Sequence, residues 1–542
     1  MVYDGHTESP MNAPVSTDRP WSLWRSLLRW GGWFFLGTLV WMRAVDGGHS
    51  PWEMNEALEL LKVRVLLADP HWYRTMWDDQ PATLMWMLRG WFAETGASVE
   101  AARVLVTVLM TVALSALAAR AESMAGRWAG LALAPLLLVN PELTQLMGAC
   151  MLEPSSIALA LLGGMLFWSR IERPTGWAIV GAGALTAWAL SVKLTAALPA
   201  QVAFWVFLHA LWRARRGDRA SGLRILGNAV LFGGVAIGGA GLLLAAGGHD
   251  WSTVHDSHVR GVFGEGGWAE LRDRTNTRAL ADAWWEAYAS LALVPTSLLL
   301  AWRHPRIWRW VFPWAMTLLV SSGVLWVYPY WHNYYLIHVA LPMTALVAPT
   351  VALTARALWG LLRILGRRRD NEGSDAGTTG RQRMAWGLAA VLVTGALAPG
   401  GLVLWENLRA VRRTVNPDRD RDEQAMLELL EQHGSRTGTV FGSSPSLTIF
   451  RSGALPVKGL ELLVDKRQMC GDLSPESALA ILQKTPPDAI WTYGLTDNSR
   501  ATIYTPFAGT NFLERHYVKV LENSAGYLWV RRDISDRISD RQ

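Results

Sequence analysis

Apolar blocks of about twenty residues recur along most of the chain and constrain its fold more than any other feature. A helix of this length crosses the roughly 30 Å hydrocarbon core of a bilayer. Of the 542 residues, 51% are hydrophobic and only 18% are charged, which excludes an ordinary soluble enzyme. We predict a polytopic α-helical membrane protein of about 11 spans, located near residues 27–45, 102–119, 128–140, 154–169, 176–191, 194–211, 225–246, 285–302, 309–327, 334–362 and 385–404.

The basic residues predict how the spans are oriented. Arginines crowd the loops that fall on the side of the N-terminus, whereas the loops 141–152 and 328–333 carry no Lys or Arg. Because basic loops stay in the cytoplasm, residues 1–26 are predicted to be cytoplasmic and the C-terminal segment to lie outside. Topology thus accounts for the net charge of +6, and nucleic acid is not an expected partner. The location that follows is the inner (cytoplasmic) membrane of a cell, with lipids as neighbours.

After the last predicted span the sequence changes to mixed charged and apolar residues. Helices and strands alternate here, which predicts a small α/β domain over 405–542. Its expected helices are Glu423–Gln432 and Pro475–Gln483, and its expected strands are Thr439–Gly442, Asp488–Tyr493, Val518–Leu521 and Tyr527–Val530. We expect this domain to lie outside the membrane, either packed over the first external loop or serving acceptor recognition, and not to be catalytic in itself.

The two cysteines, Cys150 and Cys470, are too few for a zinc-thiolate site and are not expected to form a disulfide. Metal chemistry, if present, would therefore use carboxylates or histidines. Carboxylates with histidine accommodate zinc, whereas carboxylates alone suit magnesium or manganese.

The first external loop, residues 46–101, concentrates acids beside aromatic residues. Acids held at the edge of a bilayer are costly unless they have a function or a partner. Glu53 and Glu56 are three residues apart and would share one face of a helix. Asp78 and Asp79 precede Pro81, which predicts an extended stretch leading into a second interfacial helix. We place the chemistry in this loop, against the alternative of solvated acids that cap interfacial helices.

Other polar residues near the predicted outer face admit two interpretations each. Lys193 interrupts an apolar run and either snorkels to the interface or pairs with a lipid phosphate. His258 and Arg260 lie in a glycine-rich loop, 249–278, which is better explained as a flexible polar loop than as a phosphate or metal site. An aromatic belt explains Tyr335, while His332 is a candidate for facing a phosphate.

Several short segments, in this order, are similar to a known class. They are Trp52-Glu53-Met54-Asn55-Glu56-Ala57, Asp78-Asp79-Gln80-Pro81, Gly96 to Arg103, Leu152-Glu153-Pro154, Ser191-Val192-Lys193-Leu194-Thr195 and Trp331-His332-Asn333-Tyr334-Tyr335 running into Leu341-Pro342. With the topology, they resemble the GT-C class of integral membrane glycosyltransferases over roughly residues 28–360. The resemblance is to the bacterial branch related to protein mannosyltransferases and lipid A aminoarabinose transferases, like glycosyltransferase family 39.

This resemblance implies an inverting transfer of a sugar from a polyprenyl-phosphate carrier to an extracytoplasmic acceptor, which is a lipid, a glycan or a protein. The membrane domain would span 27–404, with the first loop as its catalytic part. Relatives commonly carry Asp followed by Glu where this chain has Asn55-Glu56, and Asn cannot take up a proton at useful pH. The implied base is therefore Glu56 or Glu53, or else Asp78 or Asp79, and a chain that has lost the activity is the remaining alternative. Glu153 is implied to face the same cavity.

A base must accept the proton of the attacking hydroxyl, and positive charge must face the leaving lipid phosphate. Relatives differ in metal use, so no cofactor is assigned, and a divalent cation is an alternative to lysine. We expect a metal-independent phosphate site around Lys193. The rival function is a flippase for lipid-linked sugars or another transporter. A transporter would place polar groups near the middle of the membrane, whereas the acids here collect at the outer edge.

Overall fold

The computed structural model describes the chain in segments that cover most of the membrane part, the first loop and the C-terminal domain. They are residues 31, 53–138, 143, 146–173, 176–215, 219–247, 280–281, 288–327, 333–369, 387, 417–432, 438–443, 447–492, 501–523 and 526–539. Two predicted spans, 27–45 and 385–404, and the candidate site residues His258, Arg260 and His332 lie outside the described residues.

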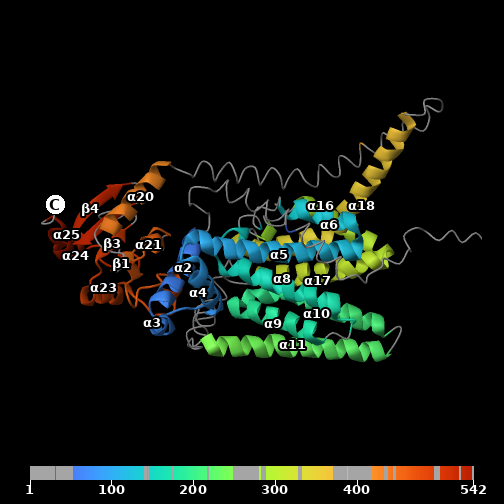
Figure 1. Cartoon of the computed structure of the whole chain (residues 1–542), viewed down its shortest axis with the longest axis horizontal. Coiled ribbons are helices and arrows are strands. Elements are labelled where there is room, and N and C mark those ends of the chain that lie inside the picture. Colours follow the sequence, from blue (N-terminus) through green and yellow to red (C-terminus); the bar gives the residue numbers. More distant parts are fainter. Residues whose placement is uncertain are drawn as a thin grey trace, which may run out of the picture.

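The membrane part is a bundle of helices that run back and forth along one axis (Figure 1). Its elements are α5 (Val99–Ala125), α6 (Arg127–Leu138), α8 (Leu152–Arg170), α9 (Gly176–Val192), η2 (Leu194–Ala196), α10 (Ala197–Ala214), α11 (Arg219–Gly247), α16 (Tyr288–Arg303), α17 (Pro305–Val327), η4 (Asn333–Leu336) and α18 (Ile337–Arg369). Each of the nine predicted spans between 102 and 362 coincides with one of these helices, so the helical membrane class is confirmed.

Within the described residues, five stretches are long and apolar enough to cross a membrane. They are Val99–Ala125, Leu152–Arg170, Leu194–Ala214, Ala220–Gly247 and Tyr334–Arg356. The last is 94% buried and forms the centre of the bundle, whereas Ala220–Gly247 is only 11% buried. Exposed leucines and isoleucines on α11, such as Ile237 and Leu242, suit contact with lipid rather than water. The total of about 11 spans remains a prediction.

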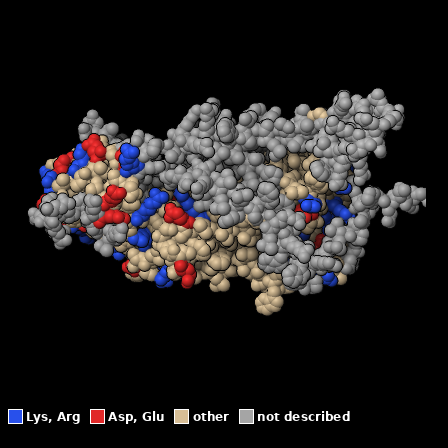
Figure 2. All heavy atoms as spheres, turned by 45° about the horizontal axis from the view of Figure 1, so that its top comes forward, with Lys and Arg blue, Asp and Glu red and all other residues tan. Residues whose placement is uncertain are grey.

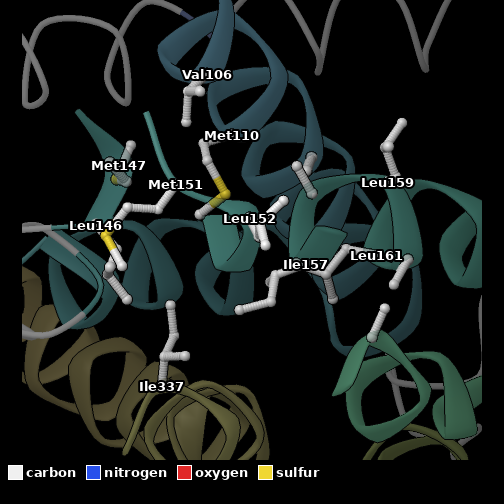
Figure 3. Close-up of a cluster of buried hydrophobic side chains, with 14 of the residues drawn as sticks. Val106, Met110, Leu146, Met147, Met151, Leu152, Ile157, Leu159, Leu161 and Ile337 are labelled. Carbon is white, nitrogen blue, oxygen red and sulfur yellow. The ribbon is translucent and has the colours of Figure 1, made fainter. Parts of the chain in front are cut away.

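The core of the bundle forms where α5, α8 and α18 meet. Figure 3 shows Val106 and Met110 of α5 above Met151, Leu152 and Ile157, with Ile337 of α18 approaching from the opposite side. All of these side chains are buried. The described surface along the middle of the bundle is largely uncharged, and its Lys, Arg, Asp and Glu residues gather toward the two ends (Figure 2). An apolar middle between charged ends is the pattern expected for a protein that spans a bilayer.

One end of the bundle collects arginines, as the sequence predicted. Arg120 donates to the carbonyl of Trp168 at 3.0 Å, and Arg213 pairs with Glu172 at 2.9 Å. Helix ends that are far apart in the sequence thus meet on one side. The first loop and the C-terminal domain lie at the opposite end (Figure 1). The relative sidedness agrees with the positive-inside argument, while the assignment of that side to the cytoplasm remains a prediction.

The first loop folds into three helices, α2 (Glu53–Ala68), α3 (Pro70–Thr75) and α4 (Thr83–Thr95). Helix α2 ends before Asp69, whose side chain accepts from the backbone N–H of His71 at 2.8 Å and caps α3, which begins at Pro70. The stretch 76–82 between α3 and α4 carries Asp78 and Asp79. The predicted helical placement of Glu53 and Glu56, and the predicted second helix after Pro81, are confirmed.

The C-terminal domain has a five-stranded mixed sheet in the order β2-β1-β3-β5-β4. Strands β1 (Thr439–Gly442), β2 (Leu455–Pro456) and β3 (Ala489–Thr492) are parallel, and the hairpin of β4 (Tyr517–Asn523) and β5 (Gly526–Arg531) pairs antiparallel to β3. The helices are α20 (Pro417–Gln432), α21 (Leu447–Ser452), α22 (Asp465–Met469), α23 (Pro475–Lys484), α24 (Phe512–His516) and α25 (Arg532–Ser539). The predicted α/β class and its predicted elements are confirmed, although α20 begins six residues earlier than expected.

This domain packs against the first loop, which lies between it and the bundle (Figure 1). Phe450 of α21 lies 6.4 Å from Phe92 of α4, measured between ring centroids. Arg64 of α2 donates to the backbone carbonyl of Gly453, just after α21. The predicted packing of the tail over the first loop is therefore confirmed.

Glycines allow the close approach of α8, α9 and α11, as is common between membrane helices. A Cβ at Gly163 of α8 would overlap the Thr186 hydroxyl and come within 2.9 Å of the carbonyl oxygen of Ala182. A Cβ at Gly234 of α11 would meet nothing within 4 Å.

We therefore expect Gly163→Ala to lower the free energy of unfolding by about 1–3 kcal/mol, because the backbone of α9 must move away. Gly234→Ala is the control and should unfold like the wild type. Thermal unfolding of the purified protein in detergent measures both. Equal stability of the two variants would contradict this packing.

Candidate functional site

Glu56 joins the first loop to the bundle. Its carboxylate is fully buried and accepts from Arg103 of α5 through Nε at 2.9 Å and Nη2 at 2.7 Å. It also accepts from the backbone N–H of Cys150 at 2.9 Å. Both oxygens are thus held by donors from two other elements. Burial raises the pKa of the Cys150 thiol well above its usual value, so this neighbour is an inert thiol.

A second buried cluster lies one turn further along α2. The Lys62 ammonium is 3.2 Å from Glu59 Oε1 and 3.0 Å from Asp78 Oδ1. Asp78 Oδ1 also accepts from the backbone N–H of Gln80 at 3.0 Å, which fixes the stretch before α4. The side chains of Glu59, Lys62 and Asp78 are all less than a tenth exposed. One cation therefore serves two carboxylates.

The charges in this second cluster shift one another's protonation. Burial raises the pKa of Glu59 to about 7, and Asp78 and Glu153 add to the rise while Lys62 opposes it. Burial alone would lower the pKa of Lys62, but Asp78 and Glu59 raise it above its ordinary value. Lys62 thus stays charged at neutral pH, and Glu59 exchanges its proton near pH 7.

A third pair comes from the bundle itself. Glu153, in the first turn of α8, is buried and bonds to Lys193, which stands between α9 and η2. The Lys193 ammonium is also 5.2 Å from the ring centroid of Tyr334 and 5.4 Å from that of Tyr335, within cation–π range. Lys193 is 8% exposed and therefore does not snorkel freely into water.

His338 lies next to Tyr335, one of these two tyrosines. Its ring centroid is 6.3 Å from that of Tyr335, and the residue is 2% exposed. Neither of its ring nitrogens has a hydrogen-bond partner among the residues that the structure describes. Buried polar groups are usually paired, so this imidazole marks a place where a polar partner is to be expected.

The C-terminal domain holds the outer part of the loop. Asp79 pairs with Lys466 of α22 at 2.6 Å, and the indole N–H of Trp72 donates to Glu461. The guanidinium of Arg467 lies 5.5 Å from the ring centroid of Trp77. The acid at position 79 therefore points to the tail, whereas the neighbouring acid at position 78 points to Lys62.

The structure thus brings together many of the residues that the sequence singled out. Glu56, Asp78, Glu153, Lys193 and Tyr335 are all buried at the loop end of the bundle. Asn55 is half-buried on α2, and Glu53 lies in the first turn of that helix.

Four residues at this end were not proposed as site residues from the sequence: Glu59, Lys62, Arg103 and His338. The spacing Glu56-x-x-Glu59-x-x-Lys62 was the available signal for two of them, since side chains three apart share a helix face. Arg103 stood in a motif segment of the resemblance, but its partner was not foreseen.

Among the described residues, no three His, Cys, Asp or Glu side chains are grouped as a metal site would require. A Lys or Arg instead lies beside each of the four buried acids at the loop end of the bundle, which are Glu56, Glu59, Asp78 and Glu153. Lysine and arginine side chains thus balance the charge of these acids. Whether a reaction at this site depends on a metal ion remains a prediction.

The Glu56–Arg103 pair predicts a large effect on stability. Removing one member of a buried ion pair leaves the other charge unpaired and costs about 3–5 kcal/mol. Glu56→Gln should lower the melting temperature of the detergent-solubilised protein, and adding Arg103→Met should restore part of it. Glu94→Gln, an exposed acid on α4, is the control and should leave the melting temperature unchanged. A melting temperature of Glu56→Gln equal to that of the control would contradict a structural role for the pair.

The sequence and the structure were each compared with known proteins. No protein-family model matches the sequence, and a search of curated proteins found no match. Solved structures do match. ArnT from Cupriavidus metallidurans, a lipid A aminoarabinose transferase crystallised with undecaprenyl phosphate, has a TM-score of 0.56 at 14% identity, covering 91% of this chain and 96% of its own. Its apo form has a TM-score of 0.52 at 15% identity, covering 92% and 97%.

An archaeal protein with the same fold matches as well. The oligosaccharyltransferase of Archaeoglobus fulgidus, solved with a tethered acceptor peptide, has a TM-score of 0.51 at 10% identity, covering 94% of this chain and 74% of its own. At these identities the likeness establishes the fold alone. The chain is therefore a membrane protein with the GT-C fold that the sequence resemblance predicted.

Proposed function

We propose that this protein is an inverting glycosyltransferase, which moves a sugar from a polyprenyl-phosphate carrier to an acceptor outside the cytoplasmic membrane. The observation that carries the proposal is the meeting of buried carboxylates and cations from the first loop with the Glu153–Lys193 pair, all at one end of a GT-C bundle. Burying so many charges has a large desolvation cost. A site that handles an anionic lipid and a hydroxyl acceptor accounts for that cost.

Lys193 is the proposed contact for the donor phosphate. As the sugar–oxygen bond breaks, negative charge grows on the departing phosphate, and a fixed cation in a dry site stabilises it. The rings of Tyr334 and Tyr335 hold the ammonium in place, and His338 offers ring nitrogens that lack partners among the described residues. Glu153 keeps Lys193 paired until the phosphate arrives. Tyr335 and Glu153 thus belong to the donor side of the proposed site.

The loop acids form the acceptor side. The attacking hydroxyl must lose its proton to a carboxylate. Both oxygens of Glu56 already accept hydrogen bonds, from Arg103 and from the backbone N–H of Cys150, which suits it to positioning α2 rather than to accepting a proton. Asp78 and Asp79 are paired with Lys62 and Lys466. Glu53 begins α2 and Asn55 directly precedes Glu56, and both belong to the acceptor side in this proposal.

The domain plan follows from the same reasoning. Residues 27–404 form the transferase domain, and 405–542 form an extracytoplasmic domain that covers the first loop. The contacts of Lys466 and Glu461 with the first loop support this placement, because the C-terminal domain and that loop must then lie on the same side of the membrane. The residues 1–26 are assigned to the cytoplasm of a bacterial cell.

A flippase or transporter is the alternative function. It needs a polar pathway that reaches both faces in turn, with its binding site near the middle of the membrane. The buried acids and their cations described above gather at one end of the bundle instead. This placement favours transfer over transport.

The direct test is sugar transfer. Membranes that contain the protein should pass label from undecaprenyl-phosphate-linked mannose, glucose or arabinose to an endogenous acceptor, and membranes without it should not.

Lys193→Met should lower kcat/KM by roughly 10–100-fold, which is the contribution of one hydrogen bond to a charged group.

The control separates folding from donor binding. Lys193→Met leaves Glu153 unpaired, so Lys193→Met combined with Glu153→Gln should regain stability without regaining transfer. Absence of transfer with all three donors, together with faster movement of the labelled lipid across bilayers that contain the protein than across bilayers without it, would contradict the proposal and favour the flippase.

A further inference from the structure

Glu59 differs from its helix neighbour Glu56 in how its two carboxylate oxygens are satisfied. Its Oε1 lies 3.2 Å from the Lys62 ammonium, but its Oε2 is buried and accepts no hydrogen bond from any residue that the structure describes. Glu56, one turn earlier on the same helix, has both oxygens occupied. Buried carboxylate oxygens without donors are rare in proteins. Glu59 therefore keeps one oxygen available for a ligand.

The surroundings of Glu59 are charged on several sides. The groups that face it come from its own helix, from α3 and the stretch after it, and from the start of α8: Lys62, Tyr73, Asp78, Cys150 and Glu153. Burial, with the charges of Asp78 and Glu153, raises the pKa of Glu59 to about 7. A general base works best when its pKa lies near the operating pH, because it is then both available and strong.

The position of Glu59 on α2 also matters. It follows Asn55 by four residues, so the two side chains are neighbours on one helix face. Asn55 occupies the place where the resemblance implied an acid, and an amide cannot take up a proton. The acid thus lies one turn further along the same face, still beside the Asp78 stretch and Glu153.

We infer that Glu59 Oε2 accepts the proton of the acceptor hydroxyl, an inference that rests on the proposed glycosyl transfer. The acceptor oxygen forms its bond to the anomeric carbon, the bond from that carbon to the carrier phosphate breaks, and the phosphate leaves with the electron pair. The proton ends on Glu59 and is then released to water. Lys62, held by Asp78, keeps the carboxylate oriented throughout.

The experiment compares Glu59→Gln and Glu59→Asp with the wild type, using the undecaprenyl-phosphate-linked sugar that supports transfer. Glu59→Gln should lower kcat by about 100-fold or more, the range for loss of a general base, with the donor KM within threefold. Glu59→Asp should retain part of kcat. In the wild type, kcat/KM should fall about tenfold for each pH unit below the Glu59 pKa of about 7, and Glu59→Gln should lack this limb.

Two controls keep the outcome decisive. Glu94→Gln, an exposed acid on α4, should behave as the wild type in rate and pH profile. The infrared band of the protonated Glu59 carboxyl is obtained by subtracting the spectrum of Glu59→Gln from that of the wild type. This band should disappear as the pH rises, with a midpoint near pH 7. The measurement holds even if a variant is partly unstable. A midpoint below about 5, as for an ordinary glutamate, would overturn the inference.

The remaining outcomes are also distinguishable. Transfer by Glu59→Gln within threefold of the wild type, with the same acidic limb, would overturn the role of Glu59 and leave the proposed function standing. Failure of the wild type to transfer any of the three sugars would overturn both.

Discussion

The pairing of buried charges between the first loop and the bundle is the constraint on which the rest of the structure depends. Burying an ion costs several kcal/mol, which only well-placed partners offset. The buried acids meet cations from other elements, in the pairs Glu56–Arg103, Asp78–Lys62 and Glu153–Lys193. The first pair joins α2 to α5 and so gives the loop one position on the bundle. The second fixes the stretch before α4 on α2, and the third ties the start of α8 to the end of α9.

The C-terminal domain fixes the same loop from the other side. Its residue Lys466 pairs with Asp79 between α3 and α4, and Glu461 accepts from Trp72 of α3. The backbone carbonyl of Gly453 accepts from Arg64 of α2. The loop is thus enclosed between an apolar bundle and a soluble domain. Exclusion of water on both sides raises the strength of every charge interaction inside. The raised pKa of Glu59 is one consequence of this enclosure.

Features that depend only on neighbouring residues in the sequence could be predicted from it. Apolar length identified the described spans, and alternation of helix and strand identified the sheet of the tail, because both depend on neighbours in sequence. The partner of Glu56 could not be predicted, since Arg103 approaches it only through tertiary packing. His338 was missed because a lone histidine in an apolar run resembles a core residue. The partner of Asp79 could not be predicted either, since Lys466 belongs to the C-terminal domain and is far away in the sequence.

The most direct measurement is an experimental structure of the protein with undecaprenyl phosphate bound. The central claim is that the charge-balanced end of the bundle receives the lipid phosphate at Lys193. The account predicts a phosphate within about 6 Å of the Lys193 ammonium, the range over which charges pair strongly, with the Glu153 pair loosened. A phosphate bound elsewhere along the chain, with the Lys193–Glu153 pair intact, would contradict the claim.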